Sequence, residues 1–307
     1  MGWFRTSTDG RGAPAPRRSQ AEGWLESIEP LDTRRYVLAV RKLADSLSHG
    51  TDRSRFLGSG VEYVQSRPYV SGDPVRAIDW RVTARTGQVH IKEFEAPKRL
   101  PAWILLDTSA SMTVSSTPRS KYELATFVAG GLALACLDRV SPVGLLGTGD
   151  RDIRIRPSLA KNQVMQWMIR LRRYRFDEGT TLARKVTELH SSLHSRALVI
   201  VLSDLHDRDG VAALKLMGQV HDVVAIQLQD PAEAGLPGAG FLRAQEAEGG
   251  ADFVTSGRRE WIDPLAVQGA MRRAGIDHLL LRTDRPVAQQ VRHFFAGRGL
   301  VPRGGKI

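Results

Sequence analysis

Five short apolar runs do most to constrain the fold of this chain. They read AWILLD, VGLLG, ALVIVLSD, DVVAIQL and HLLLR, and begin at residues 102, 143, 197, 222 and 278. Apolar runs without alternation are typical of strands buried on both faces, as in a parallel sheet. Segments with apolar residues at helical spacing lie between them, at 121–137, 160–173, 181–194 and 209–220. The alternation predicts an α/β fold with a doubly wound, mostly parallel sheet, and IRIRP at 153–157 is expected as an antiparallel edge strand.

The remaining sequence predicts how the chain is divided. Residues 1–25 are rich in glycine, proline and arginine and poor in apolar side chains, which predicts a disordered tail. Residues 26–100 are expected to form a helix that ends at Gly50 and then a small β-rich subdomain. Residues 101–307 hold the α/β domain, with an inserted hairpin expected near 240–257.

Cysteine content, hydropathy and charge indicate where the protein is located and which classes of partner it could bind. The single cysteine, Cys136, cannot form an internal disulfide, and no apolar run has the length of a membrane span, so a cytoplasmic location is expected. The formal net charge of +11 allows an acidic partner, nucleic acid among them. The arginines are scattered along the chain rather than gathered in a tail, which favours a solvated basic surface over a nucleic-acid-binding one.

Oxygen-bearing side chains follow two of the predicted strands. Asp107 ends the first apolar run, with Ser109 and Ser111 just beyond it, and Asp204 ends the run that begins at residue 197. A loop entering a helix adds two more hydroxyls, Thr180 and Thr181. Ligands of open α/β sheets bind beyond the carboxyl ends of the strands, at the switch in strand order. Carboxylates and hydroxyls there suit a hard cation such as Mg²⁺.

This pattern resembles the metal-ion-dependent adhesion site of von Willebrand factor A domains. The resemblance implies a Rossmann-type fold and a divalent cation, with Mg²⁺ preferred and Mn²⁺ or Ca²⁺ as alternatives. The metal ligands that it implies are Asp107, Ser109, Ser111, Thr180 and Asp204. The family usually reads Gly-Gly-Thr before the helix, whereas this chain has Glu178 at the first position, with Thr181 as the alternative ligand.

A second resemblance reaches upstream of the sheet. The stretch GSGVEYVQSRPYVSGDPVRAIDWRVTARTGQVHIKEFEAPKR, at 58–99, is similar to the signature of the bacterial family catalogued as domain of unknown function number fifty-eight. Members carry a von Willebrand A-like domain and often accompany MoxR-type AAA+ ATPases. The resemblance implies a non-catalytic adaptor or partner of such an ATPase in protein assembly or maturation, which receives a carboxylate from the ATPase or its client.

Two other functions stay open at this point. A Mg²⁺-dependent phosphohydrolase could use Asp107 as nucleophile, but such enzymes carry a second Asp where this chain has Ser109, which cannot act as a general acid at neutral pH. A nucleic-acid-binding protein is the other alternative, suggested by charge alone. In the segment 67–85, Trp80 is expected to anchor the small subdomain on the sheet while Arg–Asp pairs hold its loops, with a docking surface as the alternative.

Overall fold

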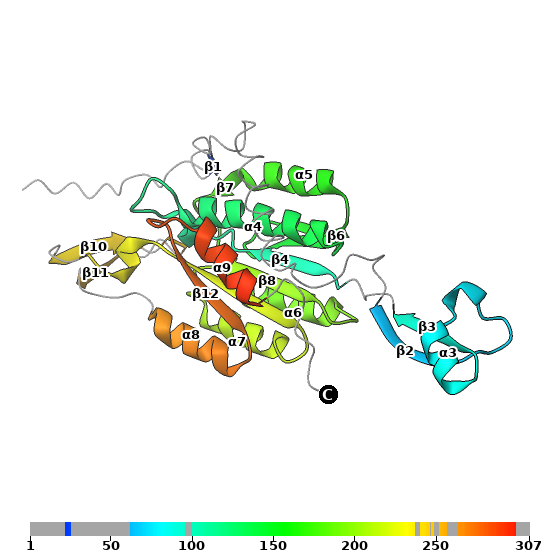
Figure 1. Ribbon diagram of the computed structural model, residues 1–307. Helices are drawn as coiled ribbons and strands as arrows, with labels where there is room; N and C mark the ends of the chain where they lie inside the picture. The colour runs from blue at the N-terminus through cyan, green and yellow to red at the C-terminus, as the bar shows by residue number, and fades with distance from the viewer. Residues whose placement is uncertain are drawn as a thin grey trace, which may run out of the picture.

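The predicted α/β fold is confirmed by a computed structural model, which describes residues 22–25, 62–95, 100–236, 240–245, 247–248, 252–256 and 263–298. Six strands form one sheet in the order β12-β9-β8-β4-β5-β6 (Figure 1). The strands are β4 (Ala102–Leu106), β5 (Val143–Gly147), β6 (Arg154–Ser158), β8 (Leu198–Ser203), β9 (Asp222–Gln229) and β12 (Asp277–Arg282). All neighbours are parallel except β5 and β6, so the expected antiparallel edge strand is also confirmed.

Helices cover both faces of the sheet (Figure 1). One face packs on α4 (Lys121–Asp138), α5 (Lys161–Leu171) and α9 (Ala288–Arg298). The other packs on α6 (Leu182–Ser192), α7 (Arg208–Met217) and α8 (Pro264–Arg273). Side chains along a strand alternate between the two cores: Ile104 lies in the first and Leu105 in the second, and both are fully buried. Burial on both faces explains why β4 reads as an unbroken apolar run.

The switch in strand order lies between β4 and β8. The chain runs from β4 to β5 on one side, and β8 then pairs with the other side of β4. Leu106 at the end of β4 lies opposite Leu202 of β8, so the residues that follow each strand emerge side by side. The Ser120 side chain accepts a hydrogen bond from Glu123 N and caps α4, which starts beside the same edge.

The first described residues of the chain differ from expectation. Within the segment expected to be disordered, β1 (Glu22–Trp24) pairs with β7 (Arg173–Arg175). The Trp24 ring stacks on the Arg172 guanidinium, with 4.5 Å between the guanidinium carbon and the ring centroid, and Leu25 is buried in the core. These long-range contacts hold a strand too short to show periodicity. The helix expected before Gly50 lies outside the described residues.

Residues 62–95, called the arm below, contain β2 (Glu62–Pro68) and β3 (His90–Glu95) as an antiparallel pair. Between them lie η2 (Val75–Ala77) and the helix α3 (Trp80–Thr86), where the sequence indicated only strands and loops. Asp79 caps α3 and Gly87 ends it with φ of 72°. Trp80 is 69% exposed, so its expected role as an anchor is wrong.

A hairpin precedes the last helix–strand–helix unit, with β10 (Phe241–Gln245) antiparallel to β11 (Asp252–Ser256). The chain emerges from it into α8, β12 and α9. Among the residues that the structure describes, no helix combines the length and apolar character needed to cross a bilayer.

Candidate metal centre

The two carboxylates predicted from the strand ends do lie at one edge of the sheet. The Asp107 backbone N–H donates to the Leu202 carbonyl at 2.9 Å, which extends the β4–β8 ladder by one residue. Ser203, the last residue of β8, donates from its hydroxyl to Asp107 Oδ2 at 2.6 Å. Asp204 follows directly, and both carboxylates are almost completely buried.

Four side chains at this edge form what we call the oxygen cluster: Asp107, Ser109, Ser111 and Asp204. A short helix, η3 (Ala110–Thr113), starts just after Ser109 and turns the two serines to the same side. Their hydroxyl oxygens are 3.0 Å apart, and Ser111 donates to Asp204 Oδ2 at 2.9 Å. Asp107 Oδ1 accepts from the Ser109 backbone N–H at 3.1 Å. Two loops far apart in sequence thus place four oxygen-bearing side chains together.

The two carboxylates of the oxygen cluster differ in their protonation. Burial, and then the nearby charge of Asp204, raise the pKa of Asp107 to about 7. Burial alone would also raise the pKa of Asp204, but the charges of Lys121 and His206 outweigh it and lower that pKa. The site therefore holds one carboxylate that its neighbours keep ionised, Asp204, and one whose charge the protein compensates poorly, Asp107.

Lys121 at the start of α4 is the counter-ion of Asp204. Its side chain is 1% exposed, and Nζ donates to Asp204 Oδ2 at 2.8 Å and to Glu233 Oε1. Burial opposes the charge on this ammonium, but Asp204 and Glu233 outweigh burial and raise the pKa of Lys121. Glu233 lies in η4 (Pro231–Ala234), whose first turn closes as a capping box with Asp230.

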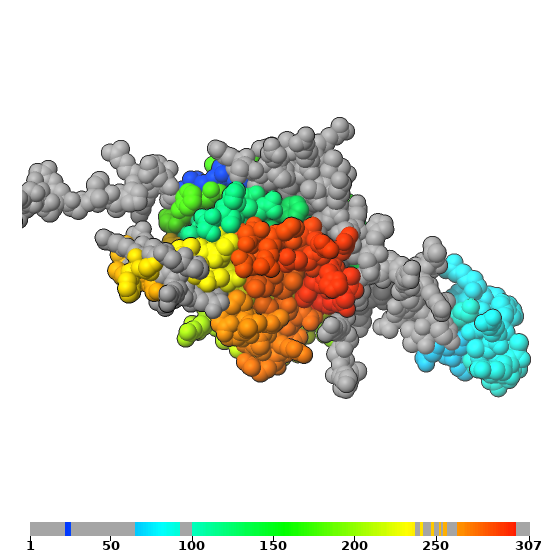
Figure 2. All heavy atoms as spheres, turned by 60° about the vertical axis from the view of Figure 1, so that its left-hand side comes forward, coloured from blue at the N-terminus to red at the C-terminus, as the bar shows by residue number. Residues whose placement is uncertain are grey.

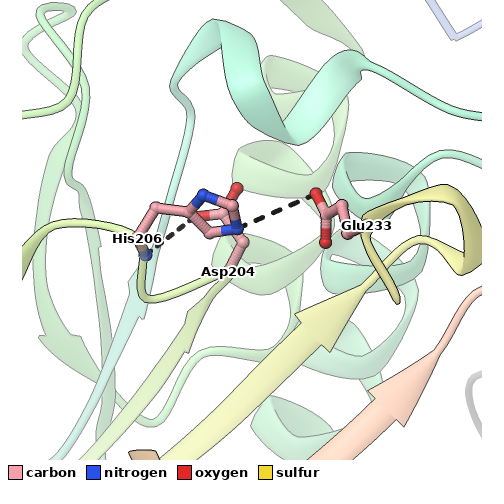
Figure 3. Close-up of side chains that lie close together, drawn as sticks. All are labelled: Asp204, His206 and Glu233. Atoms are coloured by element: carbon pink, nitrogen blue, oxygen red, sulfur yellow. Dashed lines mark hydrogen bonds and ion pairs between the residues drawn. The ribbon is translucent and has the colours of Figure 1, made fainter. Parts of the chain in front are cut away.

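Asp204 also belongs to a second group that could hold a metal ion. Ligand atoms of Asp204, His206 and Glu233 all lie within 4.8 Å of one another, and Figure 3 shows the His206 imidazole directed toward Glu233. His206 Nε2 is 3.9 Å from Glu233 Oε1, and the His206 backbone N–H is 3.4 Å from Asp204 Oδ1. Lys121 already contacts both carboxylates of this group, so its negative charge is largely compensated.

The loop that carries Thr180 touches the loop of the oxygen cluster. The Ala110 backbone N–H donates to the Glu178 carbonyl at 2.7 Å. Within the described ranges, the Thr180 hydroxyl makes no hydrogen bond, whereas the Thr181 hydroxyl donates to the carbonyls of Thr148 and Gly149 at 3.0 and 2.9 Å. Thr181 is therefore engaged by the backbone, and Thr180 is the residue whose hydroxyl can serve a ligand.

Glu178, where the resembled motif has glycine, forms a buried bridge between the two loops. Its carboxylate accepts from the Thr108 hydroxyl at 2.7 Å and from Arg151 Nε at 2.7 Å. The Thr108 hydroxyl in turn accepts from the Gly149 N–H at 3.1 Å, and a Cβ at Gly149 would overlap both side chains. Glu178, which replaces the glycine of the motif, thus adds a hydrogen bond that holds the Thr180 loop against Thr108.

The oxygen cluster fits a hard divalent cation in donor type and spacing. Mg²⁺ binds oxygen at about 2.0–2.1 Å in octahedral geometry, so neighbouring ligand oxygens lie about 2.9 Å apart. The separations of 3.0 Å between Ser109 and Ser111, and of 2.9 Å between Ser111 and Asp204, match that spacing. A cation would also relieve the repulsion from Asp204 that helps to raise the pKa of Asp107.

Three residues at this edge were not anticipated: Lys121, Ser203 and Glu233. Lys121 had a detectable signal, because a lysine in the first turn of an otherwise apolar helix opposes the helix dipole and needs a partner. Ser203 could have been found from its place beside Asp107 once β4 and β8 are paired. Glu233 lies after a different strand, and its contact with Lys121 has no local signature.

Comparisons with known proteins add a family and distant relatives. Residues 65–262 match the model of a family described as "Protein of unknown function DUF58". Uncharacterized proteins of Mycobacterium tuberculosis and Mycobacterium bovis are 28% identical over 283 residues, which covers 86% of this chain and 88% of theirs. A crystal structure of an "Uncharacterized Membrane Spanning Protein" from Vibrio fischeri is 14% identical, over 64% of this chain and 97% of that one. Its TM-score of 0.21 is too low to carry an argument.

Proposed function

The chain belongs to the DUF58 family, whose function is unknown, and from that premise we propose that it is a non-catalytic protein-interaction module that binds its partner through a divalent cation. The observation that carries the proposal is the close spacing of the serine and carboxylate oxygens in the oxygen cluster. Asp107, Ser109, Ser111 and Asp204 would hold the cation, with Thr180 completing the set. Mg²⁺ is the preferred ion because every donor is oxygen.

The charges of the site suit recruitment of a foreign carboxylate. Lys121 pairs with Asp204 Oδ2 at 2.8 Å, which leaves Asp107 as the carboxylate of the oxygen cluster whose charge the protein compensates least. Hydroxyl ligands add no charge of their own, so a cation held here keeps a positive charge and can accept a carboxylate from a partner. Ser109 stands where a phosphohydrolase needs a second acid, which supports binding rather than catalysis.

The β10–β11 hairpin contacts the Thr180 loop through its turn and carries exposed apolar side chains along its strands. Glu248, in the turn of the β10–β11 hairpin, accepts a hydrogen bond from the Thr180 N–H at 3.1 Å. Phe241 and Val254 belong to the same face of the hairpin by register, and are 84% and 71% exposed. A partner that places a carboxylate at the oxygen cluster would find apolar contacts beside it.

The resemblance to families that accompany MoxR-type ATPases suggests such an ATPase, or its client, as the partner, with the complex in the cytoplasm. We expect the purified chain and a MoxR-type ATPase from the same bacterium to bind in Mg²⁺ and to lose most of their affinity in chelator. Thr180→Ala should weaken binding, while Thr187→Ala, an exposed threonine on α6 that bonds its own helix, should not. Calorimetric titration measures each affinity.

Salt separates the cation bridge from general charge attraction. The net charge of +11 favours association with any acidic partner, and that contribution fades as salt rises. A carboxylate bound directly to a cation is screened far less, so the difference between Mg²⁺ and chelator should persist at high salt. Equal affinity with and without chelator would remove the cation bridge as the mechanism.

A further inference from the structure

The two acidic side chains of segment 67–85 are used inside the arm. Asp73 receives two hydrogen bonds from the Arg67 guanidinium, both at 2.8 Å, and these lower the pKa of Asp73. Asp79 accepts from the Ser66 hydroxyl at 2.7 Å and from the backbone N–H groups of Arg81 and Val82 at the start of α3. The expected neutralisation of arginines by interleaved acids therefore holds for Arg67 only.

The other arginines of segment 67–85 point to solvent. Arg76, Arg81 and Arg85 are all exposed, and across the ranges that the structure covers none of them forms an ion pair. Arg81 and Arg85 are four residues apart on α3 and therefore lie in one row along the helix. Segment 67–85 thus presents three arginines to solvent that no described acidic side chain pairs with.

Apolar side chains accompany these arginines. Trp80 and Ala84 form the row of α3 beside Arg81 and Arg85, and Ala84 is also exposed. Val75 is 67% exposed in η2, directly before Arg76. Figures 1 and 2 both show the arm standing clear of the sheet and its helices, so the described part of the α/β domain does not cover this face.

We propose that this face of the arm is a docking site for an acidic protein surface that carries an apolar pocket for Trp80. Tryptophan and arginine are the residues that most often dominate the binding energy of protein interfaces. Three exposed arginines that form no ion pair within the described residues select a negatively charged partner, and they disfavour a second copy of this chain, whose net charge is +11. The exposed Trp80 and Val75 side chains favour a protein over a nucleic acid, which offers phosphates and bases but few aliphatic surfaces.

This site is independent of the oxygen cluster, because no residue is shared and no cation is involved. It would give the chain two separate contacts with partners. If both contacts engage one partner, the arm adds affinity through the high effective concentration of a tethered second site.

Fluorescence anisotropy with defined probes tests the proposal on the full chain. The probes are a labelled peptide of glutamate, leucine and phenylalanine, a peptide of equal charge in which serine replaces the apolar residues, and a single-stranded DNA of similar charge. We expect the acidic, apolar peptide to bind best, and equally well in Mg²⁺ and in chelator. Trp80→Ala and the double change Arg81→Glu/Arg85→Glu should each weaken it by about thirtyfold or more.

Matched controls separate this surface from general charge and from exposed apolar groups elsewhere. Arg272→Glu/Arg273→Glu reverses two exposed arginines on α8, and Leu265→Ala removes an exposed apolar side chain from the same helix. Neither should change the affinity by more than about twofold. Because Trp80 is exposed, Trp80→Ala should keep the parent melting temperature, so that lost binding cannot be ascribed to unfolding.

Three outcomes would overturn the proposal. One is failure of the acidic, apolar peptide to bind the parent at submillimolar concentration. The second is equal affinity of the arm variants and the control variants for the peptide, which would show that the arm is not a specific site and that the peptide binds through overall charge. The third is tighter binding of the DNA than of the peptide, lost in Trp80→Ala, which would make the arm a nucleic-acid site. None of these outcomes bears on cation binding at Asp107.

Discussion

Replacing Lys121 with methionine is expected to lower the free energy of unfolding by about 3–5 kcal/mol, the cost of leaving buried charges without their partner. Lys121 Nζ contacts Asp204 and Glu233, and the lysine side chain is 1% exposed. Methionine fills similar space but cannot compensate either carboxylate. Denaturant unfolding at neutral pH in chelator measures the change without any contribution from a bound cation.

Lys161→Met provides the control for this result. Lys161 also pairs with a carboxylate, Asp138, at 3.0 Å, but its side chain is 68% exposed. Exposed ion pairs contribute about 0–1 kcal/mol, so the control should stay close to the parent. If the two lysine variants were equally stable, Lys121 could not be the counter-ion that holds Asp204 ionised.

Substitution of a buried residue usually destabilises a protein. Asp107→Asn is expected to do the opposite: without a cation, it should stabilise the protein above neutral pH. In the parent, burial and Asp204 raise the pKa of Asp107 to about 7, whereas the unfolded chain has an ordinary carboxyl with a pKa of about 3.9. Between these values the folded state binds more protons, so the free energy of unfolding falls as pH rises and levels off above about 7. The full effect is on the order of 4 kcal/mol.

Unfolding curves from pH 4 to pH 8, with chelator or with Mg²⁺, test this expectation. As the pH rises from 4 to 8, the free energy of unfolding of the parent in chelator should fall, and that of Asp107→Asn should fall less. Mg²⁺ should restore stability to the parent at pH 8 and do little at pH 5, because a cation must displace the proton of Asp107. Identical pH profiles for the parent and Asp107→Asn would show that Asp107 does not titrate in the folded state near pH 7.

The sheet could be predicted from the sequence because strands that are buried on both faces consist of unbroken apolar runs, such as the run that ends at Asp107. The same reasoning placed Asp107 and Asp204 at one edge, since the switch between β4 and β8 follows from the usual strand order. The resemblance already favoured Thr180 over Thr181, but the hydrogen bonds that engage the Thr181 hydroxyl could be found only in the structure. The backbone carbonyls that accept hydrogen bonds from Thr181 belong to residues that precede it by 33 and 32 positions in the sequence.

The misjudged features depend on contacts that no local pattern records. Trp80 was expected inside because large aromatics are usually buried, yet α3 is short and its first turn faces solvent. Spacing suggested that the acids of segment 67–85 neutralise its arginines, but Asp79 is used as a helix cap instead. For Lys121, the first-turn position in an apolar helix was a local signal, but its partners, 83 and 112 residues away, could not be identified from the sequence.

The central claim, that the oxygen cluster holds a divalent cation, is tested most directly by titrating the purified protein with Mn²⁺ and following free Mn²⁺ by electron paramagnetic resonance. We expect one tightly held Mn²⁺ per chain, displaced by Mg²⁺, with the affinity reduced at least about tenfold in Ser111→Ala and unchanged in His206→Ala. Loss of the ion in His206→Ala but not in Ser111→Ala would move the site to the group of Asp204, His206 and Glu233. Failure of the parent to retain Mn²⁺ at all would contradict the claim.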